Sequence, residues 1–561
     1  MFVRTKTTPN SLKTAVQLVE NVRTGNKIKQ TLVRHFGYAL DDPEIQALKM
    51  LALKYKSDLE NRHAPALFDC GRLMETILET SATGEDNLPL AVNLKDIKEE
   101  KRIKVGIHQT FGKIFTEIGY DRVFKNAQRK RASVRLLRDI VMARIANPAS
   151  KRSSVAMLEN QYGIVAGVNA VYRMMDLLDE AAIDKTQQRT YQYTTGLLSE
   201  KINILFYDCT TLYFESFIEG DLKQNGYSKD GKFNQSQVLL AMMVTQAGLP
   251  IGYELFEGST FEGNTLADAL KKLHQTYAIG TLIFVADSAL LSKDNIAMLQ
   301  AAHQPFIVGA RIKNQNAELT RKILDNKGYQ PLYDKIEENQ ENQTTYCDIA
   351  HHDPSLRLIV THSPDRAAKD KYDREKAIGQ LTHRLSKSKN PKALLNNYGY
   401  KKFISVQGDA HLVVDEEKIK QARQWDGLHG ITTNIKDQTA RQLIGHYKGL
   451  WQIEETFRIS KHDLRMRPIF HWTTKRIRAH IALCFMALSC MRTLEYKVRL
   501  QYRKMSPAAI RNTLLSIEVS LLKDYKTGKR YSLPSKATQD AKKIYQLLGL
   551  RWTDTPWLVK K

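Results

Sequence analysis

The sequence predicts an α/β fold in which a mixed sheet is interrupted by an insertion. Three observations support this prediction: alternating strand and helix signals from residue 202 to 310, a looser polar stretch after them, and helical periodicity that resumes near Arg441. The 561 residues correspond to about three or four domains at roughly 150 residues each. The hydrophobic share of 42% is typical of a chain that buries a large core.

These changes in pattern divide the chain into six segments. In chain order, we expect an N-terminal β-hairpin unit, a helical and basic region, the first part of an α/β core, a β-rich insertion, the remainder of the core and a basic tail. Their expected bounds are residues 1–44, 45–198, 199–310, 311–438, 439–500 and 501–561.

The first two segments are predicted from local composition. The runs VQLVENV and KIKQTLV flank the turn-forming Arg23–Asn26, which indicates a hairpin. Helical patterns follow, and residues 101–152 carry 14 Lys and Arg but only 3 Asp and Glu. Two short amphipathic helices around Gly163 resemble a helix-turn-helix. We expect these helices to contact DNA, with a plain helical scaffold as the alternative.

The core is predicted from the order of its strand and helix signals. The β-rich runs INILFYDCTTLYFES, VLLAMMVT and PIGYELFEG come first, and the last two flank a hairpin turn at Gln246–Leu249. A helix, the buried strand TLIFVAD, a second helix and the strand PFIVGARI follow. Three antiparallel strands followed by this alternation predict a sheet of ribonuclease-H-like order.

The insertion is predicted because a polar stretch of this length is unusual as a loop inside a compact domain. It contains the strand candidates RLIVTH, KFISVQ and HLVVD and one charged helix candidate, DRAAKDKYDREKAIGQLTHRLSK. Helical periodicity from Arg441 to about Leu500 then completes the core. The tail after it is basic, with helical stretches.

Charge is the most unusual property of the chain. The 85 Lys and Arg against 60 Asp and Glu give a net charge of +25 and a pI near 9.6. Such a surplus favours a nucleic-acid partner, with a generally basic surface as the alternative. The N-terminus resembles no signal peptide, and the apolar run Ile481–Met491 is too short to span a bilayer. The five scattered cysteines fit neither a disulfide framework nor a paired-Cys zinc site, so we expect a reducing, intracellular compartment. Because the apolar run is short, we expect no membrane partner.

Two carboxylates stand out in the predicted sheet. Strand alternation places Asp208 on one face with Phe206 and Thr210, where a charge is costly unless a metal ion or a buried Lys or Arg compensates it. Asp287 closes the buried run TLIFVAD, and loops at the carboxyl ends of strands are common places for catalytic groups. A helix N-cap would explain Asp287 equally well.

A third carboxylate lies on a predicted helix with an unusual face. Tyr447, Glu454 and Lys461 are each seven residues apart, which is about 20° short of two helical turns, so they share one face. Trp451 and Arg458 lie near the same face. These residue types indicate a functional surface, and a surface helix held by Glu454–Arg458 pairing is the alternative.

The neighbourhood of this helix is basic. Residues 441–510 contain 14 Lys and Arg against 4 Asp and Glu. Basic groups hold phosphates, whereas carboxylates hold hard divalent cations through oxygen. Two such cations can activate an attacking oxygen and stabilise the leaving oxygen. The combination is typical of an enzyme that acts on nucleic acid.

Together these features resemble the DDE transposases of bacterial insertion sequences, in the superfamily with a Tyr-Arg-Glu-Lys signature on the Glu helix and a β-rich insertion before it. The most specific match is the spacing Y-x2-L-x3-E-x6-K from Tyr447 to Lys461. The other matching segments are YDCTTLYFES, GYELFEGSTFEGNTL, VADSALLS and HWTTKRIRAHIALCFMAL. The resemblance covers about residues 200–500.

The resemblance implies roles for particular residues. Asp208, Asp287 and Glu454 would be the catalytic triad and would bind two Mg²⁺ ions, with Mn²⁺ as a substitute. The residues implied to contact DNA are Tyr447, Trp451, Arg458 and Lys461, with Trp451 near the strand being cut and Trp425 of the insertion against a flipped base.

The sequence departs from the family signature at two positions. Leu450 stands where the signature has Arg, so one phosphate contact would be missing or would be supplied by Lys448. Ala289 stands where a Gly is usually found two residues after the second Asp. Neither change removes an implied metal ligand. We therefore expect the two departures to affect the rate of DNA cleavage more than its mechanism.

The implied activity is metal-assisted DNA transposition. A homodimer on double-stranded DNA would cleave the transposon ends and join the freed 3′-hydroxyl to target DNA, in the bacterial cytoplasm near the nucleoid. One alternative is a catalytically inactive, decayed or domesticated, sequence-specific DNA-binding protein. Another is a different ribonuclease-H-like nuclease, such as a resolvase.

Overall fold

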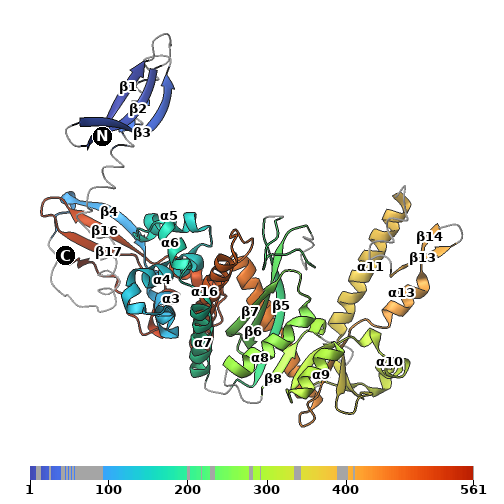
Figure 1. Ribbon diagram of the computed structural model, residues 1–561. Coiled ribbons are helices and arrows are strands. Elements are labelled where there is room, and N and C mark those ends of the chain that lie inside the picture. Colours follow the sequence, from blue (N-terminus) through green and yellow to red (C-terminus); the bar gives the residue numbers. More distant parts are fainter. Residues whose placement is uncertain are drawn as a thin grey trace.

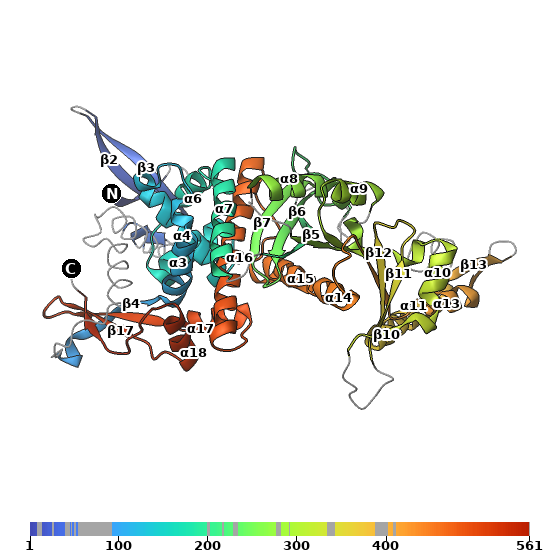
Figure 2. The same ribbon diagram turned by 90° about the horizontal axis from the view of Figure 1, so that it is seen from below.

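The computed structural model shows an elongated molecule with a large mixed sheet at its centre (Figures 1 and 2). The N-terminal sheet and the insertion lie at opposite ends. The described residues are 1–7, 14–24, 27–39, 92–198, 202–215, 218–227, 234–276, 282–290, 292–333, 343–387, 402–407 and 411–559, together with residues 45, 48, 49, 52, 53 and 56.

The N-terminal unit is a three-stranded antiparallel sheet. Its strands, in spatial order, are β1 (Phe2–Thr7), β2 (Thr14–Thr24) and β3 (Lys27–Ala39). The pairing of β2 with β3 confirms the predicted hairpin. Gly25 and Asn26 of the predicted turn lie outside the described residues, and strand β1 was not predicted.

The next segment is mainly helical, as predicted. Its long helices are α3 (Gly106–Ile118), α4 (Arg131–Ala146), α5 (Lys151–Tyr162), α6 (Val168–Met175) and α7 (Glu180–Leu197). The hydroxyl of Ser150 caps α5 by accepting a hydrogen bond from Ser153 N at 3.1 Å. Gly163, with φ of +72°, ends the helix in the left-handed region. The two helices expected around Gly163 are therefore present.

A second small sheet joins this region to the C-terminal segment. Its order is β18 (Trp557–Leu558), β17 (Arg530–Pro534), β16 (Glu518–Asp524) and β4 (Ile97–Lys104). Helices α17 (Pro507–Leu515) and α18 (Gln539–Leu547) accompany it. The prediction of a helical tail is therefore incomplete. The sequence IKEEKRIK conceals β4 because only Ile103 of the strand is buried.

The central sheet has nine strands. In spatial order they are β10 (Gln330–Pro331), β11 (Thr345–Ala350), β12 (Arg357–His362), β15 (Leu428–Thr433), β9 (Phe306–Ala310), β8 (Ile283–Ala286), β5 (Ile204–Tyr213), β6 (Gln237–Thr245) and β7 (Pro250–Glu257). Strands β5, β8 and β9 are parallel, and the other pairs are antiparallel. The α/β class is confirmed.

Helices cover both faces of this sheet (Figure 2). On one face lie α8 (Leu266–Thr276) and α9 (Lys293–Ala301), and on the other lie α14 (Ala440–Lys448) and α15 (Trp451–Arg458). Helix α16 (Thr474–Gln501) lies beside β7 and packs against α3, α4 and α7 of the helical region. In the described part of the chain, α16 alone is long and apolar enough to cross a membrane, and 94% of its most apolar window is buried inside the protein. It is therefore most simply a core helix.

The insertion is mixed in secondary structure, which corrects the expectation that it is β-rich. It contains α10 (Ala317–Leu324), α11 (Pro364–Lys387), α13 (Glu416–Arg423) and the hairpin of β13 (Ile404–Gln407) and β14 (His411–Val414). Helix α11 alone spans 24 residues, and its many Lys and Arg residues, with Ala and Leu, favour helix. Strands β10, β11, β12 and β15 extend the central sheet rather than forming a separate one.

Candidate active site

Strand register brings the first two predicted carboxylates together. Tyr207 of β5 pairs in parallel with Ala286 of β8, so the next residues, Asp208 and Asp287, follow side by side on neighbouring strands. Adjacent strands lie roughly 4.8 Å apart. The sequence predicted the two residues separately. The parallel pairing of β5 with β8 explains why they lie next to each other in the sheet.

The face of β5 that carries Asp208 is the one predicted. Phe206 and Leu212 pack in the core that contains α15, whereas Tyr207 and Cys209 pack in the core on the opposite face. One carboxylate oxygen of Asp208 accepts a hydrogen bond from Cys209 N at 2.7 Å. Asp208 is half-buried.

The N-cap alternative for Asp287 does not apply to helix α9. Ser292 caps that helix through its hydroxyl, which accepts from Asn295 N at 3.1 Å. Asp287 is exposed, and its Oδ1 accepts from Ser288 N at 2.6 Å at the start of a short 3₁₀ turn, Ser288–Leu290. Its position at the carboxyl end of a central strand therefore favours a role in the candidate active site over a helix-capping role.

The predicted long helix is broken where it approaches the sheet. Between α14 and α15, Leu450 N bonds to Tyr447 O at 3.0 Å, which is the tighter 3₁₀ pattern. A Cβ atom at Gly449 would overlap the ring of Phe206 on β5, so glycine permits this approach. After α15 comes a π-helical turn, Ile459–Asp463. Tyr447, Glu454 and Lys461 therefore do not share one continuous α-helical face.

The structure does not contain the Glu454–Arg458 pair that the sequence left open as an alternative. Its guanidinium bonds both oxygens of Glu455, at 2.7 and 2.8 Å, and pairs with Asp463 across the π turn at 3.3 Å. It therefore pairs with these two carboxylates and not with Glu454. Glu454 is exposed on the side of α15 that faces the two aspartates.

Tyr447 occupies a narrow place beside Asp287. A Cβ atom at Gly309 of β9 would lie 2.7 Å from the Tyr447 hydroxyl and 2.9 Å from Ser288 N, so glycine leaves room for this contact. Burial raises the pKa of Tyr447 above its usual range, and the negative charges of Asp287, Glu454 and Asp208 raise it further. The hydroxyl thus remains protonated and is available as a donor.

A single cavity of about 710 Å³ unites most of the predicted residues. The predicted residues that line it are Asp208, Asp287, Tyr447, Lys448, Leu450, Trp451 and Glu454. Arg458 and Lys461 do not line it. Among the described residues, no three His, Cys, Asp or Glu side chains form a compact metal-binding group. The three carboxylates therefore surround the cavity without touching one another.

The two departures from the signature have different surroundings. Leu450 lines the cavity as an apolar residue, next to Lys448, whose ammonium donates to the Tyr333 hydroxyl at 3.0 Å. Lys448 and Leu450 thus line the same cavity. Ala289 lies inside the short 3₁₀ turn after Asp287.

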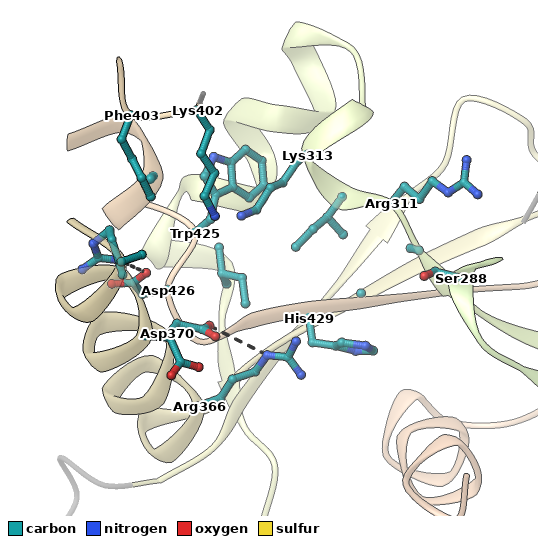
Figure 3. A pocket seen from close by; sticks show the side chains of 18 of the residues that line it. Ser288, Arg311, Lys313, Arg366, Asp370, Lys402, Phe403, Trp425, Asp426 and His429 are labelled. Atoms are coloured by element: carbon teal, nitrogen blue, oxygen red, sulfur yellow. Dashed lines mark hydrogen bonds and ion pairs between the residues drawn. The ribbon is translucent and has the colours of Figure 1, made fainter. Parts of the chain in front are cut away.

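Trp425 lines a second cavity, of about 600 Å³, in the insertion (Figure 3). Lys313 lies over its ring, 5.9 Å from the centroid. Asp287, Arg366 and His429 border both cavities, so the two adjoin.

Sequence reasoning missed two of these shared residues, Arg366 and His429. The guanidinium of Arg366 lies 3.9 Å from Asp370, and the ring centroid of His429 lies 5.2 Å from that of Tyr447. Burial lowers the pKa of His429, and Arg366 lowers it further. No local motif marks either residue, because each comes to the site through the folding of the insertion.

Comparison with known proteins identifies the class to which this fold and cavity belong. The family model of the transposase DDE domain matches residues 181–490, which is more than half of the chain. The chain therefore belongs to the transposase DDE domain family. No curated protein matches it. The solved structure of the piggyBac transposase synaptic complex with hairpin DNA is similar at a TM-score of 0.36 and 8% identity, covering 79% of this chain and 77% of that one.

Proposed function

We propose that this protein is a DNA transposase that binds insertion-sequence ends, cleaves phosphodiester bonds there and joins the 3′-hydroxyl to target DNA. Besides family membership, one structural observation supports this proposal. The parallel register of β5 and β8 sets Asp208 beside Asp287, and Glu454 enters the same cavity from the opposing helix. Three carboxylates around one cavity in a basic chain suit phosphodiester chemistry.

The scaffold supports this proposal through its topology. The spatial order β7-β6-β5-β8-β9, with β6 antiparallel to its neighbours, agrees with the ribonuclease-H-like order expected from the sequence. We take these five strands as the catalytic core. The segment from 311 to 438 is then the insertion, and the six expected segments remain our division of the chain.

The carboxylates fit a divalent metal by their chemistry. Asp208, Asp287 and Glu454 offer only oxygen donors, which Mg²⁺ and Mn²⁺ accept. They line one cavity that is open to solvent rather than a closed apolar core. When bound, two such ions would activate the attacking oxygen and stabilise the leaving oxygen of an in-line displacement.

The remaining cavity residues suit binding of the DNA backbone. The protonated Tyr447 hydroxyl would donate a hydrogen bond to a phosphate oxygen beside Asp287. Lys448 would add positive charge where the family signature has Arg, and the exposed indole of Trp451 would lie against the strand being cut. Arg458 and Lys461 lie outside the cavity and would contact phosphates along the flank of the DNA.

The second cavity suits a nucleotide displaced from the duplex. Trp425 and Lys313 offer an aromatic ring and a cation, and Arg366 stands between this cavity and the carboxylates. A base flipped toward Trp425 would keep its phosphate near Arg366. We also propose that two copies assemble on the two transposon ends, within a bacterial cell.

The decisive experiment is a cleavage assay with matched carboxylate variants. Purified protein is incubated with Mg²⁺ and DNA carrying the ends that flank its own gene, and the 3′ ends are mapped. Wild-type protein should cut at the ends, and Glu454→Gln should retain end binding but lose cleavage. Glu455→Gln is the matched control because Glu455 is the adjacent residue and pairs with Arg458 outside the cavity.

The outcomes separate the proposal from its rivals. End binding without any cutting by the wild type would support the inactive DNA-binding protein instead. Cutting by Glu454→Gln at the wild-type rate would refute the role of Glu454. The same comparison applies to Asp208→Asn and Asp287→Asn.

A further inference from the structure

The loop that follows the catalytic helix returns to the end of β5. Ile469 N donates to Tyr213 O at 3.0 Å, and Phe214 pairs with Ile469 in a short parallel bridge. Tyr213 lies five residues past Asp208 on the same strand. At roughly 3.3 Å per residue, this contact is about 17 Å from the carboxylate.

Two large aromatic side chains of this loop are exposed. Phe470 is 64% and Trp472 is 68% exposed, although the rest of the loop is anchored to the protein. Scattered exposed aromatics are ordinary on a protein surface. Two of them on one anchored loop beside a candidate active site, however, indicate a binding surface.

Buried and half-buried cations lie over Trp472 and over the two rings at the end of β5, Phe214 and Tyr213. The ammonium of Lys223, a residue that is only 5% exposed, lies 4.9 Å from the Trp472 ring centroid and 5.2 Å from that of Phe214. The guanidinium of Arg467 lies 5.2 Å from the ring centroid of Tyr213. The buried Lys223 thus lies against the Trp472 indole, and most of that side chain remains exposed to solvent.

The same surface continues to the helical region. The guanidinium of Arg476 lies 4.7 Å from the ring centroid of Tyr172 on α6 and pairs with Asp176 at 3.2 Å. The ring of His471 lies 6.4 Å from the same tyrosine, edge to face. Helix α6, the loop and the end of β5 thus form one surface on which aromatic rings alternate with cations.

We propose that Phe470 and Trp472 form a stacking platform for unpaired nucleotides of the transposon-end DNA next to the cleavage site. This inference rests on the proposed function and adds a second DNA contact outside the cavity. Aromatic faces stack on any base, and the neighbouring cations attract the phosphates between bases. Along the axis of a B-form duplex, about 17 Å equals about five base-pair steps, so the platform lies within a few nucleotides of the candidate cleavage site.

The test compares two DNA probes that need no known end sequence. One is a short fluorescein-labelled duplex with a single-stranded oligo-thymidine tail, and the other is the same duplex with blunt ends. The full chain should bind the tailed probe more tightly. Trp472→Ala should lose about tenfold of that affinity, equivalent to about 1.4 kcal/mol, while its affinity for the blunt probe stays unchanged. Trp472→Phe should retain the preference for the tailed probe.

Tyr525→Ala is the matched control. Tyr525 is 57% exposed, with the ammonium groups of Lys98 and Lys523 each 5.2 Å from its ring centroid. It thus combines the same residue types on the small sheet of the C-terminal segment. The preference for the tailed probe should not change in this variant.

Three outcomes would overturn the inference. Trp472→Ala could keep the preference, or it could lose affinity equally for both probes. A change in the sedimentation coefficient of Trp472→Ala without DNA would instead identify the surface as a contact between protein copies. Because the assay needs no cleavage, Glu454→Gln should show the wild-type preference. A preference for the tailed probe without any end cleavage would show that the platform binds unpaired nucleotides although the proposed catalytic function fails.

Discussion

Lys461 lies beyond the carboxylate cavity, with its ammonium 6.0 Å from the ring centroid of Phe457. If it contacts one DNA phosphate, its removal loses that contact, and binding then releases about one counterion fewer. Lys461→Ala should therefore weaken end binding and reduce the slope of log affinity against log salt by about one. Fluorescence anisotropy titrations over a series of salt concentrations measure this slope.

Lys526→Ala provides the comparison for that experiment. Lys526 is an exposed lysine of the C-terminal segment, 4.0 Å from Asp96. Its removal changes the net charge by the same amount but should leave the slope unchanged. A wild-type slope in Lys461→Ala would show that Lys461 contacts no phosphate in the complex.

Single residues of the site could be predicted where they interrupt a local sequence pattern. Asp208 interrupts an apolar strand face and Asp287 ends an apolar run, so both appear in the sequence as exceptions. Arg366 and His429 could not be found in this way, because folding of the insertion brings them to the cavity. Arg458 was placed correctly on its helix, but its partners depend on the π turn that brings Asp463 close.

At the scale of elements, the approach of the Glu454 helix to β5 depends on Gly449. A Cβ atom there would overlap the Phe206 ring, so Gly449→Ala should push α15 away from the sheet and displace Glu454 from the aspartates. Displacements of about 1 Å can cost about 100-fold in rate. End cleavage with Mg²⁺ should fall by about that factor, while end binding should change little.

Gly445→Ala is the matched control on the preceding helix. No atom lies within 4 Å of a Cβ built at Gly445, which is exposed on α14. Alanine there should preserve cleavage and stabilise the helix by up to about 1 kcal/mol. Equal cleavage rates for both variants would show that close contact with Phe206 does not position Glu454.

Elements of the core were predictable because each one carries a strong pattern. Strands β5, β6 and β8 are almost wholly buried and appear as apolar runs, and glycine or polar turns separate them from the helices. Strand β4 lacks this signal because its charged side chains face solvent. Strands β16 and β17 pair with each other, but β16 also pairs with β4, more than 400 residues earlier, and no local pattern predicts such a contact.

At the scale of the whole molecule, buried cations join the helical region to the core. Arg144 of α4 donates to Leu464 O at 3.4 Å, and the ammonium of Lys151 on α5 lies 3.5 Å from His480 Nδ1. His480 Nε2 lies 3.0 Å from Met466 O. A carbonyl only accepts, so Nε2 carries the proton and Nδ1 accepts from Lys151. His480 is therefore neutral in the folded protein.

This arrangement makes the junction sensitive to acid. Burial lowers the pKa of His471 to about 3, and the charges of Lys151, Arg144 and Arg476 contribute. Burial also lowers the pKa of His480, with further contributions from Lys151 and Arg144. Unfolded histidines bind protons below about pH 6.5, whereas these two do not. The two histidines therefore do not lower stability above that pH, and stability declines as the pH falls from there toward 3.

The decline should be measurable between pH 6.5 and 5, before most carboxylates titrate. Each buried histidine should lower the free energy of unfolding by up to about 1.4 kcal/mol per pH unit, a limit approached toward pH 5 as the unfolded histidine becomes fully protonated. Equilibrium urea unfolding at several pH values gives the slope for the wild type. His471→Gln should remove one histidine's share of it, since glutamine does not titrate. If the slope is the same in both proteins, His471 is solvated at the junction and the helical region is not held against the core in this way.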